Sequence, residues 1–213
     1  MYKVISEYAR QHQVTLVAVS KTRPVEAIMM LYDQGQRVFG ENRVQELESK
    51  YDVLPKDIQW HLIGHLQKNK VKYIAPFVSM IHSVDSYELL EVIHQQGLKN
   101  NRVIPVLLQF HIAQEETKFG FNIEEALQLL QDLSANPLDH VNICGVMGMA
   151  SFTDNKEIVR QEFHTLKGYF TQLKSTYFVD VADFKEISMG MSGDYEIAIA
   201  EGSTMIRVGS ALF

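Results

Sequence analysis

Lys21 lies at the end of a predicted strand, a position that suits a reactive amine. It directly follows the apolar run 14–20 and precedes Thr22, Arg23 and Pro24. A lysine at the end of a buried strand projects into a partly dry pocket, where desolvation favours the neutral, nucleophilic amine. Such an amine forms a Schiff base with an aldehyde, whereas an ordinary surface lysine only carries a solvated charge. We therefore expect Lys21 to bond to an aldehyde ligand.

Two pairs of small residues near the end of the chain are suited to binding phosphate. Ser192-Gly193 precedes a predicted short helix, and Gly209-Ser210 follows the last apolar run. Backbone N–H groups at a helix start have no partner within the helix, and together with the helix dipole they attract anions. The alternative is that both glycines form tight turns and that Ser192 or Asp194 caps the helix. We expect the Asp194 side chain at the cap, because pointing inward it would repel a phosphate.

Arg207 belongs to the last apolar run. A period of two places Arg207 and Gly209 on one face of this strand, and Ile206 and Val208 on the other. A guanidinium only donates hydrogen bonds, so beside a pyridine nitrogen it keeps that nitrogen unprotonated and makes the ring a weaker electron sink. A structural ion pair inside the fold is the open alternative. An amine, a phosphate pocket and this arginine together suggest a phosphorylated aldehyde, either pyridoxal 5′-phosphate or a sugar phosphate.

Histidines at the ends of neighbouring predicted strands raise the question of a metal site. His61, His65, His82 and His111 have imidazole rings, which suit zinc or iron. No His-x-His pair and no second cluster of carboxylates completes a ligand set, so we expect hydrogen bonding rather than a metal. Cys144, the single cysteine, lies within an apolar run and is expected to pack rather than to act as a nucleophile.

The elements that position these residues alternate regularly. Eight runs rich in apolar and β-branched residues predict strands, and 213 residues shared among eight gives about 27 per unit, the size of a strand with its crossover helix. The predicted strands are 14–20, 37–39, 59–63, 79–84, 103–109, 141–147, 186–189 and 205–208.

Amphipathic stretches between these runs predict helices. One helix begins at Pro24 and ends at Gly35, and another begins at Asp85 or Ser86 and ends at Gly97. Further apolar stripes predict helices within 123–133 and 163–173. A helix over 2–11 precedes the first strand and can cover the gap that a missing helix after the eighth strand would leave.

Eight alternating units predict a closed (β/α)₈ barrel of the TIM type. Several strands are apolar on both faces, as parallel strands between a barrel interior and an outer helix layer are. We predict a single domain over 1–213, with an N-terminal helix and no helix after the last strand. The alternative is an open, doubly wound sheet. In a barrel the active site lies at the carboxyl ends of the strands, where the residues above collect.

Composition and charge exclude several classes of protein. The chain has 213 residues, 46% of them hydrophobic, and a net charge of −6, so neither nucleic acid nor a membrane is an expected partner. The first residues lack the charged-then-apolar pattern of a signal peptide, and one cysteine excludes an internal disulfide. We expect a cytoplasmic protein that is a monomer.

Five segments together closely resemble the pyridoxal phosphate homeostasis protein family, which is similar to the barrel domain of alanine racemase. The resemblance runs from about residue 14 to residue 213, in order and at the spacing of the family. The segments are AVSKT at 18–22, FGEN at 39–42, WHLIGHLQKNK at 60–70, SMGMSGD at 188–194 and GSTMIRVG at 202–209.

The resemblance implies a role for each candidate residue. Lys21 corresponds to the lysine that carries pyridoxal 5′-phosphate as an internal aldimine. Arg207 corresponds to the arginine near the pyridine nitrogen, while Asn42 and His61 match motif residues near the cofactor. The positions that match the phosphate site are Ser192, Gly193, Gly209 and Ser210.

The resemblance also implies a non-catalytic role in vitamin B6 homeostasis, in which the protein supplies the cofactor to apo-enzymes that require it. Related racemases need a second, β-rich domain that contributes an acid or base, and we expect no such domain here. An open cofactor face suits reversible carriage better than sheltered carbanion chemistry. One alternative is a pyridoxal phosphate enzyme such as an amino-acid racemase or decarboxylase. A Schiff-base aldolase acting on sugar phosphates is the other.

Overall fold

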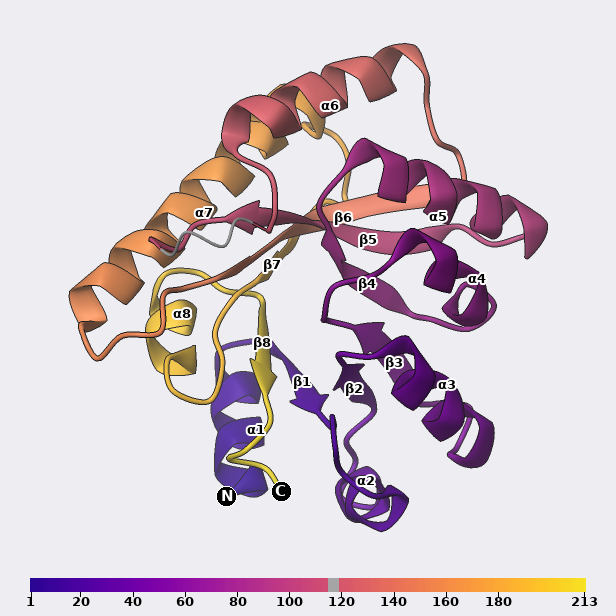
Figure 1. Cartoon of the computed structure of the whole chain (residues 1–213). Coiled ribbons are helices and arrows are strands. Elements are labelled where there is room, and N and C mark those ends of the chain that lie inside the picture. Colours follow the sequence, from indigo (N-terminus) through magenta and orange to yellow (C-terminus); the bar gives the residue numbers. More distant parts are fainter. Residues whose placement is uncertain (115–118) are drawn as a thin grey trace.

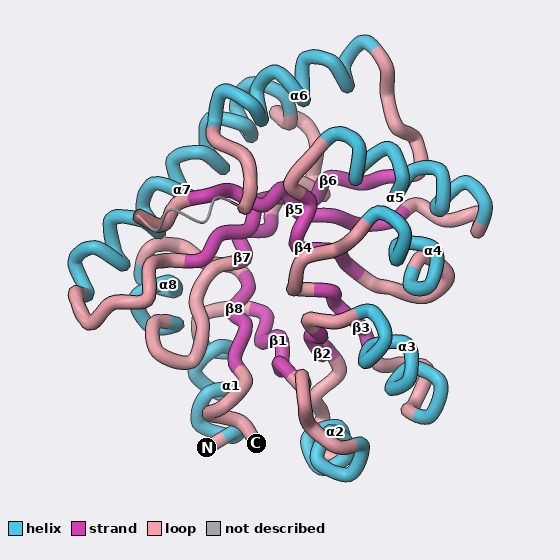
Figure 2. The backbone as a smooth tube through the Cα atoms, viewed as in Figure 1, coloured by secondary structure: helices cyan, strands magenta, loops and turns pink. Residues whose placement is uncertain are grey.

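The sheet is a closed parallel barrel. The computed structural model describes residues 1–114 and 119–213. Each strand hydrogen-bonds to the next in chain order, and β1 pairs with β8 to close the ring (Figures 1 and 2). The strands are β1 Thr15–Val19, β2 Val38–Glu41, β3 Gln59–Leu62, β4 Met80–Val84, β5 Ile104–His111, β6 Val141–Met149, β7 Glu186–Ser188 and β8 Met205–Val208. The closed barrel is confirmed, and the open sheet is excluded.

Helices surround the barrel, and Figure 2 shows them outside the ring of strands. They are α1 Tyr2–Gln11, α2 Val25–Tyr32, α3 Val44–Val53, the short 3₁₀ helix η1 Lys68–Lys70, α4 Val71–Ile74, α5 Tyr87–Lys99, α6 Ile123–Ala135, α7 Lys156–Tyr177 and α8 Tyr195–Ala200. No helix within 1–114 or 119–213 is long and apolar enough to cross a membrane.

Side chains along β8 alternate between the barrel interior and the core that lies between the barrel and its helices. Ile206 and Val208 join the apolar core that lies between the barrel and its helices. Arg207, between them, is 4% exposed and lies on the opposite face, which lines the barrel interior. The predicted alternation along this strand is thereby confirmed.

Helix α1 packs next to the seam where β1 meets β8. Tyr2, Ile5 and Ala9 are its buried residues, and the Tyr2 hydroxyl donates to Gln36 Oε1 over 3.2 Å. Beyond β8, residues 209–213 form turns. Figure 1 shows the two termini side by side at this seam, so α1 occupies the place of an eighth crossover helix as predicted.

One helix prediction needs correction, and one helix of the structure was not predicted. Gly97 does not end α5, which continues to Lys99, because this glycine lies inside the helix against a neighbouring backbone: a Cβ there would be 2.8 Å from the His140 carbonyl oxygen. Helix α3 has no separate prediction from the sequence. Its buried residues are Val44, Leu47 and Lys50, and a lysine on the inner face weakens the apolar stripe.

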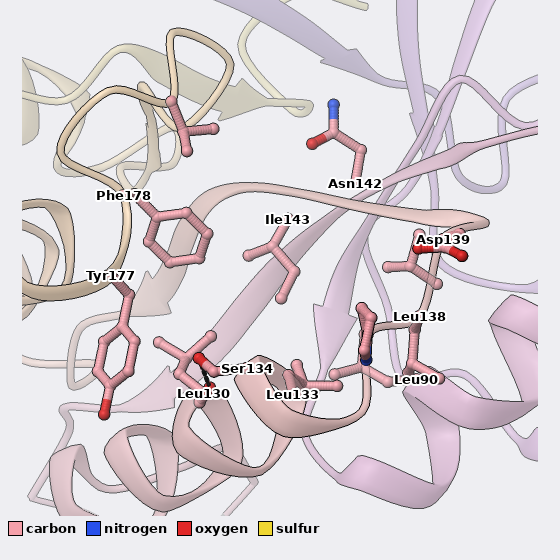
Figure 3. A pocket seen from close by; sticks show the side chains of 13 residues that line it. Leu90, Leu130, Leu133, Ser134, Leu138, Asp139, Asn142, Ile143, Tyr177 and Phe178 are labelled. Atoms are coloured by element: carbon pink, nitrogen blue, oxygen red, sulfur yellow. Dashed lines mark hydrogen bonds between the residues drawn. The ribbon is translucent and has the colours of Figure 1, made fainter.

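An apolar cavity of about 340 Å³ lies at the opposite end of the barrel from the carboxyl ends of the strands. Figure 3 shows Leu130 and Leu133 of α6, Ile143 of β6, and Tyr177 and Phe178 at the end of α7 around it. The cavity is remote from every candidate residue of the sequence and is set apart from the site described next.

Candidate functional site

The barrel brings the predicted residues to one end. Parallel strands present their carboxyl ends at the same rim, so the loops after β1, β2, β7 and β8 converge there. His61 lies within β3 and Arg207 within β8, both facing the interior. The remaining candidates lie in the loops: Lys21 after β1, Asn42 after β2, Ser192 and Gly193 after β7, and Gly209 and Ser210 after β8.

The loops after β7 and β8 contact each other directly. The Gly209 N–H and the Ser210 hydroxyl both lie within hydrogen-bonding distance of Ser192 Oγ, at 3.3 and 3.2 Å. A Cβ on Gly209 would lie 3.3 Å from Val19, so the chain passes close to β1 here, whereas a Cβ on Gly193 would meet nothing within 4 Å. Gly193 therefore borders open space, and the adjacent Ser192 hydroxyl contacts the Ser210 hydroxyl. We call these four residues, Ser192, Gly193, Gly209 and Ser210, the cradle; its polar groups suit a phosphate.

The Asp194 side chain does not cap α8 as predicted. Asp194 is the N-cap residue by position, but its carboxylate accepts a hydrogen bond from the Met191 N–H, three residues earlier. The carboxylate thus closes the turn that contains Ser192 and Gly193. It therefore holds the turn next to the cradle and accepts no hydrogen bond from the first N–H groups of α8.

Lys21 lies in a tight turn and is exposed. The Arg23 N–H donates to the Ser20 carbonyl over 3.0 Å, which closes a four-residue turn around Lys21 and Thr22. Thr22 has φ of 62°, in the left-handed region that a β-branched residue rarely adopts. The predicted location at the barrel mouth is confirmed, but the side chain is more solvated than the expected partly dry pocket.

A buried charged cluster holds this turn from behind. Lys50 Nζ, on α3, donates to Glu41 Oε1, Glu46 Oε1 and the Ser20 carbonyl, each over 2.7 Å. The Ser20 hydroxyl donates to the same Glu41 oxygen over 2.6 Å, and the Thr22 N–H donates to Glu46 Oε1 over 2.5 Å. The backbone on both sides of Lys21 is therefore fixed by one lysine and two carboxylates.

Glu41 is the most deeply buried member of this cluster, at 0% exposed. Its second oxygen, Oε2, has no hydrogen-bond partner among the described residues. Burial raises the pKa of the Glu41 carboxyl, and the hydrogen bonds from Lys50 and Ser20 oppose that rise. Neither Glu41 nor Lys50 was singled out as a functional residue, and the available signal was the i, i+4 spacing of Glu46 and Lys50.

A second polar chain crosses the barrel interior. Arg207 Nη1 donates to Ser188 Oγ over 2.6 Å, and Nη2 donates to the Gly148 carbonyl over 3.0 Å. Ser188 Oγ lies 3.0 Å from His82 Nδ1, and His82 Nε2 lies 2.9 Å from His61 Nδ1. The chain thus runs from β8 through β7 and β4 to β3.

Burial determines which of these side chains are charged. It lowers the pKa of His61 to about 4 and that of His82 well below its usual value, so both rings are neutral at pH 7. Burial also lowers the pKa of Arg207 to about 10, which still leaves the guanidinium charged. Both described hydrogen-bond partners of Arg207 are neutral, so the barrel interior holds a buried positive charge that favours an anionic or electron-rich ligand.

The remaining candidates have simpler surroundings. Asn42 is half-buried, and its backbone packs against Gly64, where a Cβ would lie 2.5 Å from the Asn42 carbonyl oxygen. Burial raises the pKa of the Cys144 thiol to about 11, which leaves it protonated and suited to packing. In the parts of the chain that the structure describes, no three side chains of His, Cys, Asp or Glu are grouped to hold a metal.

Comparison with known proteins identifies the family of this chain. The sequence model of the alanine racemase N-terminal domain matches residues 2–213. A pyridoxal phosphate homeostasis protein of Aquifex aeolicus is 41% identical over 199 residues, covering 93% of this chain and 85% of that protein. The chain belongs to the pyridoxal phosphate homeostasis protein family. A human member is 34% identical over 211 residues, an alignment that covers 94% of this chain and 76% of the human protein.

Solved structures place this homeostasis-family chain among the same relatives. PipY of Synechococcus elongatus superimposes with a TM-score of 0.91 at 35% identity, over 100% of this chain and 99% of PipY. A second PipY structure, described as having PLP bound, has a TM-score of 0.88 at 34% identity. Alanine racemase of Bartonella henselae, at 19% identity and a TM-score of 0.71, shares the fold.

Proposed function

We propose that this chain binds pyridoxal 5′-phosphate and holds it for vitamin B6 homeostasis, without a reaction of its own. The observation that carries the proposal is the meeting, at one end of the barrel, of an amine, a serine-lined cradle and a buried guanidinium. PipY, a family member that matches this chain over 99% of its own chain, has been solved with PLP bound, which supports the same ligand here.

The cradle is proposed to hold the phosphate group. Ser192 and Ser210 offer hydroxyl donors, and the backbone at Gly193 and Gly209 approaches without a side chain in the way. The phosphate would exchange the weak contacts at Ser192 Oγ, of 3.2 and 3.3 Å, for charge-assisted hydrogen bonds, which are roughly twice as strong.

Lys21 is proposed to supply the amine to which the cofactor's aldehyde bonds. When bound, the cofactor brings a reactive aldehyde and an electron-withdrawing pyridine ring. The cluster of Lys50, Glu41 and Glu46 fixes the turn around Lys21, so the amine starts from a defined position. Because the turn is fixed before the ligand arrives, little backbone entropy remains to be lost on binding.

Arg207, His61 and Asn42 are proposed to hold the ring. The guanidinium donates hydrogen bonds and cannot accept a proton, so it would leave the pyridine nitrogen unprotonated. A weakly electron-withdrawing ring suits carriage of the cofactor better than carbanion chemistry. The homeostasis names of the relatives agree with carriage. We further propose a cytoplasmic monomer that passes the cofactor to apo-enzymes.

The phosphate cradle is tested with Gly193→Ala. A methyl group at this position meets no protein atom within 4 Å, so the variant folds normally, but the methyl enters the space proposed for phosphate. Gly168→Ala on α7 is the matched control, since a Cβ there also meets nothing and lies far from the site. Titration with pyridoxal 5′-phosphate is followed by visible absorbance and by calorimetry.

We expect the wild type and Gly168→Ala to bind pyridoxal 5′-phosphate alike, and Gly193→Ala to bind about tenfold or more weakly, a change of about 1.4 kcal/mol. Pyridoxal without its phosphate should not distinguish the three proteins. Absence of binding by the wild type would overturn the proposed function. Equal affinity of Gly193→Ala would overturn the location of the phosphate.

A further inference from the structure

The hydrogen bonds between Arg207 and His61 have one consistent direction. Arg207 only donates, so its 2.6 Å contact makes Ser188 Oγ an acceptor. The Ser188 hydroxyl carries one proton of its own, and His82 Nδ1, at 3.0 Å, is its described neighbour on the other side. Donation from Ser188 to His82 Nδ1 therefore satisfies both contacts with the one available proton.

The direction then passes along both rings. A neutral imidazole has one N–H and one acceptor nitrogen, so a His82 ring that accepts at Nδ1 carries its proton on Nε2. That N–H points to His61 Nδ1 over 2.9 Å, which must accept in turn. His61 is left with its proton on Nε2, at the edge of the ring away from His82.

The reverse direction leaves a group unsatisfied. If His82 Nδ1 carried the proton, it would donate to a Ser188 oxygen that already accepts from Arg207, and the Ser188 proton would need a different acceptor. Ser188 is 0% exposed, so its hydroxyl proton would be buried without an acceptor, which makes this arrangement the less stable one. Because Ser188 is buried, the arrangement in which its hydroxyl donates to His82 is favoured over the reverse direction.

We propose that Ser188 and His82 are positioning residues that transmit the donor character of Arg207 across the barrel, so that His61 presents an N–H donor and never an acceptor to the bound ligand. Only the identity of the ligand that contacts His61 rests on the proposed function. The arrangement itself belongs to the unliganded protein. It commits the β3 side of the site to a ligand group that accepts a hydrogen bond, such as a phenolate or carbonyl oxygen.

The tautomers are measured by two-bond ¹H–¹⁵N correlation spectra of ¹⁵N-labelled protein without ligand at pH 7. We expect both His61 and His82 to show the Nε2–H tautomer. The Nδ1–H tautomer at either ring overturns the proposal, whether or not the protein binds pyridoxal 5′-phosphate. Failure to bind that ligand would instead overturn the proposed function and leave the tautomer result standing.

Ser188→Ala tests the transmission, and Ser203→Ala is its matched control. Ser203 is also a buried hydroxyl, but it donates only to backbone carbonyls and is not part of the hydrogen bonds that run from Arg207 to His61. Its contacts are the carbonyls of Ile187, Met189 and Met205. We expect the His82 Nδ1 resonance to shift towards that of an imine nitrogen without a hydrogen bond in Ser188→Ala only. Pyridoxal 5′-phosphate should bind about tenfold more weakly to this variant, and Ser188→Thr, which keeps the hydroxyl, should restore the resonance.

Unchanged His82 resonances in Ser188→Ala would overturn the proposal. So would equal shifts in both alanine variants, because these would show a general loss of packing. If Ser188→Ala does not fold, the tautomers of the wild type alone decide, since the opposite tautomer at either ring is incompatible with donation from Arg207 through Ser188.

Discussion

Lys50 Nζ lies 2.7 Å from the Ser20 carbonyl oxygen, the last carbonyl before Lys21. The same ammonium group contacts Glu41 and Glu46, so a lysine on the inner face of α3 connects the ends of two strands to the turn that holds the candidate amine. A surface salt bridge would contribute little to such an arrangement, but Lys50 and Glu41 are 7% and 0% exposed in their side chains.

Replacing Lys50 should be strongly destabilising. Lys50→Met keeps the length of the side chain but leaves the Glu41 carboxylate buried without its cation, which costs about 3–5 kcal/mol. We expect the free energy of unfolding in urea to fall by that amount. Lys99→Met is the control, because Lys99 is exposed at the end of α5 and should change stability by less than about 0.5 kcal/mol. Equal losses in the two variants would contradict the structural role of the cluster.

The buried histidines predict how stability depends on pH. Burial lowers the pKa of His61 from 6.5 to about 4, so between these values the unfolded chain binds a proton that the folded chain does not. The stabilising effect of the neutral ring is complete above pH 6.5 and is lost as the pH falls towards 4, with a slope of about 1.4 kcal/mol per pH unit. His82, whose pKa is also lowered, acts in the same direction.

Urea unfolding between pH 4.5 and 7 measures this slope. We expect His61→Asn to have a smaller slope than the wild type, by about one proton. His12→Asn, at an exposed ring on the end of α1, is the control substitution for the loss of a buried ring. A wild-type stability that stays constant from pH 7 to pH 4.5 would be inconsistent with two neutral, buried rings.

Two helical glycines should respond oppositely to the same substitution. A Cβ on Gly97 would lie 2.8 Å from the His140 carbonyl and 2.9 Å from that of Arg102, whereas one on Gly168 would meet nothing within 4 Å. We expect Gly97→Ala to destabilise the protein by about 1–3 kcal/mol through overpacking. Gly168→Ala should stabilise it by about 0.5–1 kcal/mol. Thermal unfolding of the two variants decides this, and a stabilised Gly97→Ala would show that the close contact is absent.

The contrast between these glycines also shows what could be predicted from the sequence. The period of two along 205–208 was enough to place Arg207 in the interior, and the spacing of the apolar runs predicted the barrel. Gly97 was predicted to end its helix because a local pattern carries no record of His140, which approaches from the start of another strand 43 residues later.

The same limit applies to the site. The position of these residues at one end of the barrel could be predicted because each lies in a loop that follows a strand, and the fold alone brings strand ends together. They are Lys21, Ser192, Gly193, Gly209 and Ser210. The roles of Lys50, Glu41 and Ser188 depend on which helix face and which strand register oppose one another. Those relationships are set by tertiary packing, which a single sequence does not record.

We propose that Lys21 is the residue that anchors the cofactor. The most direct measurement is peptide mapping by mass spectrometry, after wild-type protein has been incubated with pyridoxal 5′-phosphate and reduced with borohydride. We expect a single stoichiometric label on Lys21, with buried Lys50 and exposed Lys72 serving as unlabelled internal references. A label concentrated on any other lysine, or no label at all, would contradict it.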